Sequence, residues 1–430
     1  MRLRRPAWDQ YNRTSHTNKM AMPGGKIMDK TAFYANARND VRGPMHGIKV
    51  VEATTTWAGP MAACLLADFG ATVIKVELPQ GEVARVLPPF LPDSKLTLAH
   101  ETVNRNKQNV SLDLRVPEGR AIFLKLCESA DIVIENFKPG TLASWGVGYA
   151  DVAAVKPDII YVSVSGFGQF GPLSERPAYD PIAQNFCGWT SLNGDPQGGP
   201  TKAPTFLGDD LAGMHGALGA MAALAHRHRT GEGQHVDVAL IDGLMFQSNG
   251  NLTAGAIGIP LKRYGNQFSL AAPVNVYECA DGRIYGGVLL DSHWRSLCGL
   301  MGCDELAHLR NVERVERRDE LDALMATWCR QFSTDEVVAK LTDIGLAVTR
   351  VNTFAEASAH PHVAARDMLQ TMRLADGSEI PLTGPAAKFS RTPTAVREPA
   401  PSLGQHNESI YGALGYDAAE LARLREAGVI

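Results

Sequence analysis

The sequence predicts an α/β protein with a largely parallel β-sheet covered by helices on both faces. Short β-branched strands alternate with apolar helices from residue 48 to residue 240, which is the pattern of repeated β-α-β units. A stretch of different character begins at Pro273, where an antiparallel hairpin replaces this alternation. At 430 residues the chain is also longer than one hydrophobic core usually organises, so we expect two domains.

The first part of the chain supplies the strands of the expected sheet. A strand is followed by a turn at Ala58-Gly59-Pro60, and Met61 to Phe69 is an apolar helix that ends at Gly70. A second helix is expected over residues 117–129. The expected strands span residues 48–52, 72–77, 109–114, 131–135, 159–165 and 235–240.

The remaining segments differ in composition from this alternating part. Residues 1–45 are polar and lack periodicity, so we expect an N-terminal extension. The Gly-, Asn- and Pro-containing stretch 251–272 resembles a linker, and hairpin strands are expected at 274–279 and 284–289. The Pro-rich last section ends in a short amphipathic helix at 418–427.

Composition excludes several function classes. The net charge of −4 argues against a general affinity for nucleic acid or anionic membranes. Seven scattered cysteines without a C-x-x-C pair argue against a disulfide framework and a metal site. The basic N-terminus is not followed by an apolar run, and the apolar stretch 211–225 is too short to span a bilayer. We therefore expect a cytoplasmic protein with no metal and no membrane partner.

A candidate reactive group lies in the stretch from Thr205 to Gly216. Asp209 is expected near the start of a long helix, as an N-cap whose side chain accepts first-turn N–H groups. Gly213, Gly216 and Gly219 follow at three-residue spacing, which leaves one helix face bare for close approach of another backbone.

Two other catalytic patterns are disfavoured. The stretch Gly166-Phe-Gly168-Gln-Phe-Gly171 matches a dinucleotide fingerprint, but a loop follows it instead of the helix that this motif must open. The histidines are dispersed and no G-x-S-x-G elbow is present, which disfavours a Ser-His-Asp triad.

Three basic residues lie beside ends of the predicted strands. Because ligands of open α/β sheets bind outside the carboxyl ends of the strands, Lys107, Arg115 and Lys138 are candidates to bind an anionic cofactor.

Several motifs in order along the chain resemble the class III CoA-transferase family, which includes carnitine and formyl-CoA transferases. The resemblance runs from about residue 46 to the end of the chain. The matching motifs lie at residues 58–60, 66–71, 73–77, 104–107, 131–137, 230–234 and 401–406.

This resemblance implies a Rossmann-like large domain built from both ends of the chain, with a smaller α+β domain between them. It also implies an interlocked dimer with coenzyme A (CoA) in a cleft between the domains. The expected division is 1–45 for the N-terminal extension, 46–250 for the first part of the large domain, 251–355 for the small domain with its linkers, and 356–430 for the return to the large domain.

The resemblance also implies the site residues. The family's nucleophilic aspartate stands four residues before a glycine, which corresponds to Asp209 and Gly213; the neighbouring Asp210 is the weaker candidate. The family's CoA-contact positions fall on Thr56, Trp57, Ala58, Leu112, Arg115, Asn136, Phe137, Lys138 and Tyr179. Leu78, Ser144 and Pro177 replace cations found in formyl-CoA transferases.

The implied function is transfer of CoA from an acyl-CoA donor to a free carboxylic acid, through an aspartyl mixed anhydride and an aspartyl-CoA thioester. Attack requires an ionised Asp209, so we expect its surroundings to keep its pKa low. Trp57, Phe137, Trp189 and Phe206 are candidates to line an apolar acyl pocket.

Two alternatives remain open. The first is an α-methylacyl-CoA racemase or epimerase, but its second acid/base, a histidine, is replaced here by Tyr179. A phenol, with an ordinary pKa of about 10, is a poor proton acceptor at neutral pH. The second is a non-catalytic CoA-binding subunit of a heteromeric transferase. We expect a homodimer, with a heterodimer with a paralogous subunit as the alternative.

Overall fold

The computed structural model describes residues 28–430, so most of the expected N-terminal extension lies outside the described residues. Six parallel strands form one sheet in the order β3-β2-β1-β4-β5-β6, which confirms the α/β prediction. From the neighbouring strands β1 and β4 the chain adds strands in opposite directions: β2 and β3 lie beyond β1, and β5 and β6 lie beyond β4, as in doubly wound sheets. The strands are β1 (Lys49–Ala53), β2 (Thr72–Glu77), β3 (Gln108–Ser111), β4 (Ile132–Glu135), β5 (Ile160–Ser165) and β6 (Gln234–Ala239).

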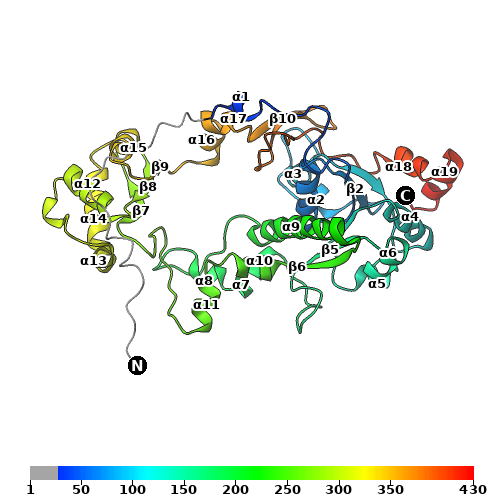
Figure 1. The fold of residues 1–430 in the computed structure, drawn as a ribbon, viewed down its shortest axis with the longest axis horizontal. Helices are drawn as coiled ribbons and strands as arrows, with labels where there is room; N and C mark the ends of the chain where they lie inside the picture. Colours follow the sequence, from blue (N-terminus) through cyan, green and yellow to red (C-terminus); the bar gives the residue numbers. More distant parts are fainter. Residues whose placement is uncertain (1–27) are drawn as a thin grey trace.

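Helices cover both faces of this sheet (Figure 1). Each face has its own apolar core, and the β-branched strands contribute to both because successive side chains point to opposite faces. One core contains residues of α2 (Ala58–Asp68), α7 (Asp180–Phe186), α9 (Leu207–Thr230) and α10 (Leu240–Phe246). The other contains residues of α4 (Pro117–Cys127), α5 (Thr141–Ser144), α6 (Tyr149–Val155), α18 (Asn407–Ala413) and α19 (Ala418–Glu426).

A second body lies at the other end of the long axis (Figure 1). An antiparallel sheet in the order β7-β8-β9 packs there with α12, α14 and α15 around a separate core that includes Tyr277, Trp294 and Leu321, and α13 lies against α14. Its strands are β7 (Val274–Glu278), β8 (Arg283–Gly287) and β9 (Val348–Arg350), and its helices are α12 (Asp291–Met301), α13 (Asn311–Glu316), α14 (Arg318–Cys329) and α15 (Thr334–Asp343).

Shorter elements connect or flank these two bodies. The hairpin of β10 (Leu369–Arg373) and β11 (Glu379–Thr383) has a small core of its own, and α18 and α19 return the chain to the six-stranded sheet. The other elements are α1 (Lys30–Phe33), η2 (Val83–Arg85), α3 (Leu98–Asn104), α8 (Trp189–Leu192), α11 (Asn251–Ala256), η3 (Asp304–Leu306), α16 (Phe354–Ser358) and α17 (Pro361–Ala365).

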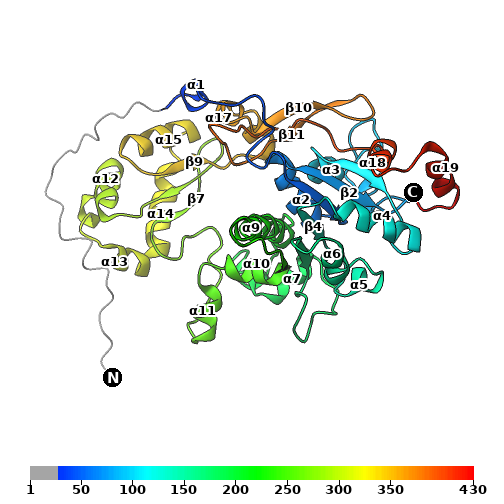
Figure 2. The ribbon, with the colours of Figure 1, turned by 45° about the vertical axis from the view of Figure 1, so that its right-hand side comes forward.

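Helix α9 packs closely against its neighbours through its glycines. Figure 2 looks nearly along α9 and shows it between α2 and the pair α7 and α10. A Cβ atom added to Gly213 would lie 3.0 Å from the carbonyl oxygen of Ala58, and one added to Gly219 would lie 2.9 Å from Val236 Cγ1. The predicted bare face of this helix is therefore confirmed.

Some element boundaries differ from the prediction. Ala58-Gly59-Pro60 is the first turn of α2 and not a separate turn, because proline is tolerated where a helix N–H has no partner. Gly59 is needed there, since a Cβ would lie 2.8 Å from Asn136 and from Thr54. Helix α11 lies inside the stretch predicted as a linker, and the hairpin of β10 and β11 was not predicted.

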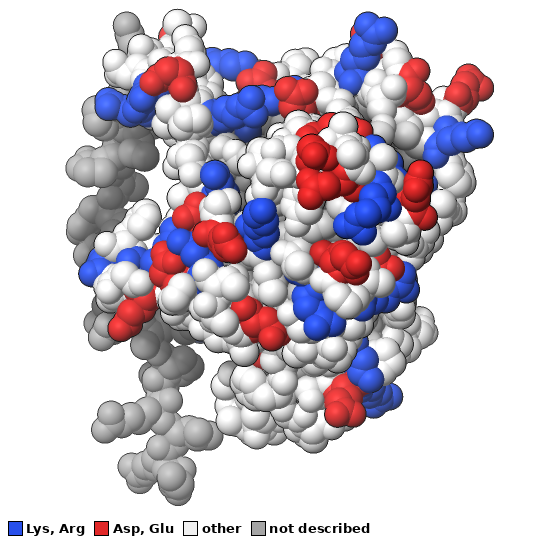
Figure 3. Space-filling view, turned by 90° about the vertical axis from the view of Figure 1, so that its right-hand side faces the viewer, with Lys and Arg blue, Asp and Glu red and all other residues white. Residues whose placement is uncertain are grey.

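The described surface carries no large field of one charge on the face that Figure 3 shows. Lys and Arg side chains are interspersed there with Asp and Glu side chains. Across residues 28–430, no helix has both the length and the apolar composition that a membrane crossing requires.

Candidate active site

A cavity of about 300 Å³ opens outside the carboxyl ends of β1, β4 and β5. The loops after these strands form its walls, and Asp209 from the first turn of α9 also lines it. This is the place where the sheet order reverses, and ligands of doubly wound sheets bind at such a point.

The loops after β1 and β4 are joined across this reversal point. The Thr55 N–H donates to Oδ1 of Asn136 at 2.8 Å, and Nδ2 of Asn136 donates to the Thr55 carbonyl oxygen at 2.8 Å. This reciprocal pair holds one wall of the cavity in place without using a charged group.

Thr56 adopts a left-handed backbone conformation, with φ of 70°. A β-branched residue rarely adopts this region, and strained residues of this kind occur mostly at functional sites. The Thr56 N–H donates to Oε2 of Glu82 at 2.7 Å. The turn that leads from β1 into α2 is therefore held by a carboxylate from the loop after β2.

The two neighbouring aspartates of α9 have different surroundings. Nε1 of Trp57 donates to Oδ1 of Asp210 at 2.7 Å, and the indole packs edge-to-face on Phe206 at 5.1 Å. Among residues 28–430, no donor is hydrogen-bonded to the carboxylate of Asp209, and this residue lines the cavity. Asp209 is thus available to a ligand, whereas Asp210 is engaged by the indole.

The predicted N-cap role of Asp209 is wrong. Phe206 is the N-cap residue, and Asp209 is the third residue of α9. The cap comes instead from Asp180, at the start of α7, whose Oδ1 accepts the Gly208 N–H at 2.6 Å. Nε2 of Gln184 donates to the other oxygen of Asp180 at 2.8 Å, so both carboxylate oxygens of Asp180 accept a hydrogen bond.

The pKa of Asp209 is raised to about 7, which contradicts the expected low value. Burial disfavours the ionised form most strongly, and the charges of Asp180 and Asp210 add to the effect. The positive end of α9 favours an anion, but three carboxylates share this helix start and weaken that effect. The carboxylate is therefore poised between its two forms near neutral pH.

Most of the predicted CoA contacts lie in one place. Thr56, Trp57, Ala58, Asn136, Phe137, Lys138 and Tyr179 line the same cavity as Asp209. Leu112 lines a neighbouring cavity of about 180 Å³, with Thr55 and Phe137 common to both linings. Arg115 lines neither cavity; it is exposed and forms an ion pair with Asp113 at 2.7 Å.

One further expectation about the site is wrong. Lys107 cannot reach a ligand, because it is buried with its Nζ atom bonded to Glu52, Pro60 and Asn104. Trp189 lines a different cavity, of about 590 Å³. Phe206 is not among the residues that line the Asp209 cavity, but it packs on Trp57, which is.

Sequence reasoning also missed three residues of this region. Asp180 caps α9, Glu82 holds Thr56, and Arg176 lines the cavity from the loop after β5. An acidic residue followed by proline at position 181 is a helix-start signal that could have indicated Asp180. Nothing local in the sequence points to Glu82.

Two other features of the described residues resemble binding sites, but neither fits the predicted chemistry. Ligand atoms of Glu77, Glu82 and His100 lie within 4.8 Å of one another. However, Arg85 and Lys75 already bind these carboxylates, so a metal ion would lie against two positive charges. A larger cavity, of about 1390 Å³, contains none of the predicted site residues.

Comparison with known proteins settles the family. Residues 45–407 match the sequence model of CoA-transferase family III. The chain belongs to CoA-transferase family III. It is therefore an enzyme of a family that acts on CoA thioesters.

Individual members of CoA-transferase family III are similar over nearly the whole chain. A succinyl-CoA–D-citramalate CoA-transferase of Chloroflexus aurantiacus is 35% identical, covering 90% of this chain and 98% of that protein. The succinyl-CoA–L-malate CoA-transferase β subunit of the same organism is 33% identical, covering 90% and 98%. The crystal structure of a CAIB/BAIF family protein from Brucella suis is similar with a TM-score of 0.77 and 33% identity, covering 87% of this chain and 100% of that one.

Proposed function

We propose that this enzyme transfers CoA from an acyl-CoA donor to a free carboxylic acid, with Asp209 as the nucleophile. The observation that supports this most directly is the cavity itself. It brings a carboxylate without a hydrogen-bonded partner among residues 28–430 together with seven of the nine positions that the resemblance implies as CoA contacts.

The two adjoining cavities suit the two ends of CoA. The pantetheine arm would lie in the cavity that contains Asp209, and the adenine would lie in the neighbouring one, whose lining includes Leu78, Leu112 and Trp145. Apolar and aromatic side chains bind a flat base through burial and stacking. Lys138 on the rim would bind a phosphate group.

The chemistry divides one acyl exchange into easier steps. The ionised Asp209 carboxylate attacks the donor thioester carbonyl, which gives a mixed anhydride and releases a thiolate. The Asp209 carbonyl carbon then accepts this thiolate, which gives an aspartyl thioester and frees the donor acid. The acceptor carboxylate next attacks the aspartyl thioester, and the same steps in reverse return Asp209 as a free carboxylate. Backbone N–H groups at the start of α9 would stabilise the tetrahedral oxyanions.

Succinyl-CoA is the proposed donor, and a short dicarboxylic acid is the proposed acceptor. Both relatives described above carry succinyl-CoA and a dicarboxylic acid in their names. Arg176 lines the Asp209 cavity, and its guanidinium would bind the carboxylate of the substrate that does not react.

The decisive experiment follows both product and enzyme adduct. Purified protein is incubated with succinyl-CoA and a panel of acids, and mass spectrometry measures new thioesters and any hydroxylamine-trapped adduct at Asp209. Asp209→Ala should abolish transfer and adduct but retain CoA binding. Asp210→Asn, which keeps an acceptor for Trp57, should still form the adduct. Appreciable turnover by Asp209→Ala would refute the covalent role.

The relative named as a β subunit favours one second candidate, a heteromeric transferase in which this chain is one of two subunits. Activity of the purified chain alone separates the two proposals. Solvent deuterium at the acyl α-carbon without CoA exchange would instead indicate a racemase.

An interlocked homodimer is the proposed assembly. Phe246, Leu252, Ile257 and Ile259, in and around α11, are each more than half exposed in the single chain. A run of large apolar side chains of this kind usually marks a protein–protein contact.

A further inference from the structure

We infer that Glu82 is a positioning residue for the active site: its two carboxylate oxygens hold the Thr56 turn, which lines the same cavity as Asp209. The inference rests on the proposed function for its catalytic consequence, but its structural part can be tested without substrate. Glu82 comes from the loop after β2 and reaches the turn after β1 across the sheet end.

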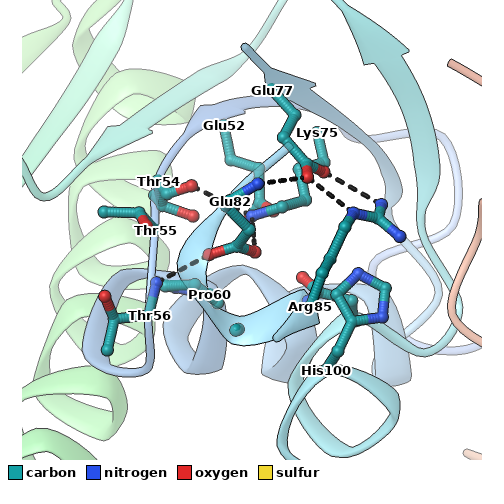
Figure 4. Close-up of polar contacts among 12 residues, drawn as sticks. Glu52, Thr54, Thr55, Thr56, Pro60, Lys75, Glu77, Glu82, Arg85 and His100 are labelled. Carbon is teal, nitrogen blue, oxygen red and sulfur yellow. Dashed lines mark hydrogen bonds and ion pairs between the residues drawn. The ribbon is translucent and has the colours of Figure 1, made fainter. Parts of the chain in front are cut away.

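Each oxygen of Glu82 serves a different donor, as Figure 4 shows. Oε2 accepts the Thr56 N–H at 2.7 Å, and Oε1 forms an ion pair with Nζ of Lys75 at 2.9 Å. A carboxylate has two acceptor oxygens, so it meets both donors at once. The Thr56 turn is thereby connected to strand β2.

Lys75 gives this connection a rigid base. Its side chain is fully buried, and Nζ donates to the Thr54 carbonyl oxygen at 3.0 Å while lying 3.5 Å from Oε1 of Glu52. Glu52 is itself paired with Lys107 at 2.9 Å. The Thr54 carbonyl oxygen is therefore bonded to Lys75 and the Thr56 N–H to Glu82, which are the two members of one ion pair. This arrangement restricts the turn between Thr54 and Thr56.

Glu82 remains charged throughout the useful pH range. Burial acts against its ionised form, but the charge of Lys75 and the hydrogen bonds from Lys75 and the Thr56 N–H outweigh it, so its pKa is lowered to about 2. Both carboxylate oxygens of Glu82 therefore remain hydrogen-bond acceptors at pH values near neutral.

The turn matters because it carries the wall of the cavity. Thr56 holds its left-handed conformation, at φ of 70°, and Trp57 follows as the N-cap of α2. The indole of Trp57 donates to Asp210, the neighbour of Asp209. A shift of the turn would move both the proposed CoA contacts and the donor that holds Asp210.

The first test is hydrogen–deuterium exchange of a peptide containing residues 54–58 in Glu82→Gln. An amide side chain has one acceptor oxygen, so either Lys75 or the Thr56 N–H loses its partner. We expect exchange at this peptide to become at least about tenfold faster, as the loss of the partly buried hydrogen bond of the Thr56 N–H implies. This measurement needs no substrate.

Asp68→Asn is the matched control. Asp68 is buried at the C-terminal end of α2, where it binds Arg105 at 2.7 Å and Asn106 at 2.7 Å. The variant loses a comparable buried ion pair about 16 Å along the helix from Trp57. It should lower the melting temperature in a similar way without changing exchange at residues 54–58.

The second test separates positioning from loss of folded protein. Glu82→Gln should raise the KM for succinyl-CoA roughly tenfold with a smaller change in kcat, since binding geometry is disturbed before chemistry. A merely structural role would lower the active fraction and leave KM unchanged. Asp68→Asn should behave in that second way.

A double-mutant cycle with Thr56→Gly isolates the turn. Glycine adopts positive φ without strain, so the turn no longer depends on the Glu82 bond. The effect of Glu82→Gln on KM should therefore shrink to less than about threefold in the Thr56→Gly background. If Glu82→Gln raises KM by the same factor with Thr56 and with Gly at position 56, the inference is wrong.

The remaining outcomes are also decisive. If Glu82→Gln does not fold, Glu82→Asp replaces it, because one methylene less prevents the carboxylate from reaching both donors, and the same local rise in exchange is expected. Unchanged exchange at residues 54–58 in a folded variant overturns the inference. Absence of transfer by the unmodified protein refutes the proposed function alone, since exchange still reports on the turn.

Discussion

At the residue scale, the activity should follow the protonation of Asp209. Its pKa is raised to about 7 by burial and then by Asp180 and Asp210, and only the ionised form attacks. We expect kcat/KM to fall about tenfold per pH unit below about pH 7 and to reach a plateau above it. A pH profile measured from pH 5 to 9 checks this, and a flat profile down to pH 5 would contradict it.

Asp180→Asn identifies the group that titrates. Asparagine keeps an acceptor for the Gly208 N–H but removes one of the charges that raise the pKa of Asp209. The acidic limb of the profile should therefore move to lower pH. A limb that stays in place would belong to the substrate or to another residue.

A stability measurement tests the same shift without activity. Because the pKa of Asp209 is higher in the folded than in the unfolded chain, ionisation costs folding free energy as pH rises from about 4 to about 7. Asp209→Asn should thus be more stable than the unmodified protein, by about 1–2 kcal/mol at pH 8 after allowing for solvent screening, and by less at pH 5. Thermal denaturation at both pH values measures this difference.

At the element scale, the bare face of α9 determines how closely the helix approaches α2. A Cβ on Gly213 would lie 2.8 Å from Met61 Cγ and 3.0 Å from the Ala58 carbonyl oxygen. Gly213→Ala should therefore destabilise the protein by about 1–3 kcal/mol, despite the higher helix propensity of alanine. Chemical denaturation measures the free energy of unfolding.

The chain offers a matched control for this substitution. Gly412 lies in α18, is exposed, and has no heavy atom within 4 Å of a Cβ added there. Gly412→Ala should change stability by less than about 1 kcal/mol, in the stabilising direction. If both variants behave alike, helix propensity alone explains the effect and the packing argument fails.

At the scale of the whole molecule, the exposed apolar side chains around α11 predict a dimer. Leu252 is 52% and Ile257 is 68% exposed in the single chain. We expect light scattering to give twice the chain mass at micromolar concentration, because obligate interfaces bury about 2,000 Å² or more. Leu252→Glu and Ile257→Glu together should shift the protein toward the mass of one chain. A monomer mass for the unmodified protein would contradict the proposed assembly.

Local sequence was sufficient for most of the fold. The β-branched strands of the parallel sheet and the glycine face of α9 were predictable, because both follow from periodicity within a few residues. The boundary errors have local causes too. Ala58-Gly59-Pro60 looked like a turn, since glycine and proline also punctuate loops, whereas contact with Asn136 requires the glycine.

The site was predicted less completely. Asp209 was identified by its place four residues before Gly213 in the motif that resembles the family, and seven of the nine expected contacts share its cavity. Lys107 illustrates the limit of that approach. Its place beside a predicted strand suggested a ligand contact, but Glu52 of β1, which is separated from β3 by β2, binds it inside the protein.

The sequence by itself determined the order of strands and helices, the family, and the candidate nucleophile, because these depend on local patterns and short motifs. Only the tertiary structure decided which charges remain accessible and which way the pKa of Asp209 shifts. It also brought Asp180 and Glu82 to the site from other segments. The physical reason is that burial and charge act through space, between residues that the sequence keeps far apart.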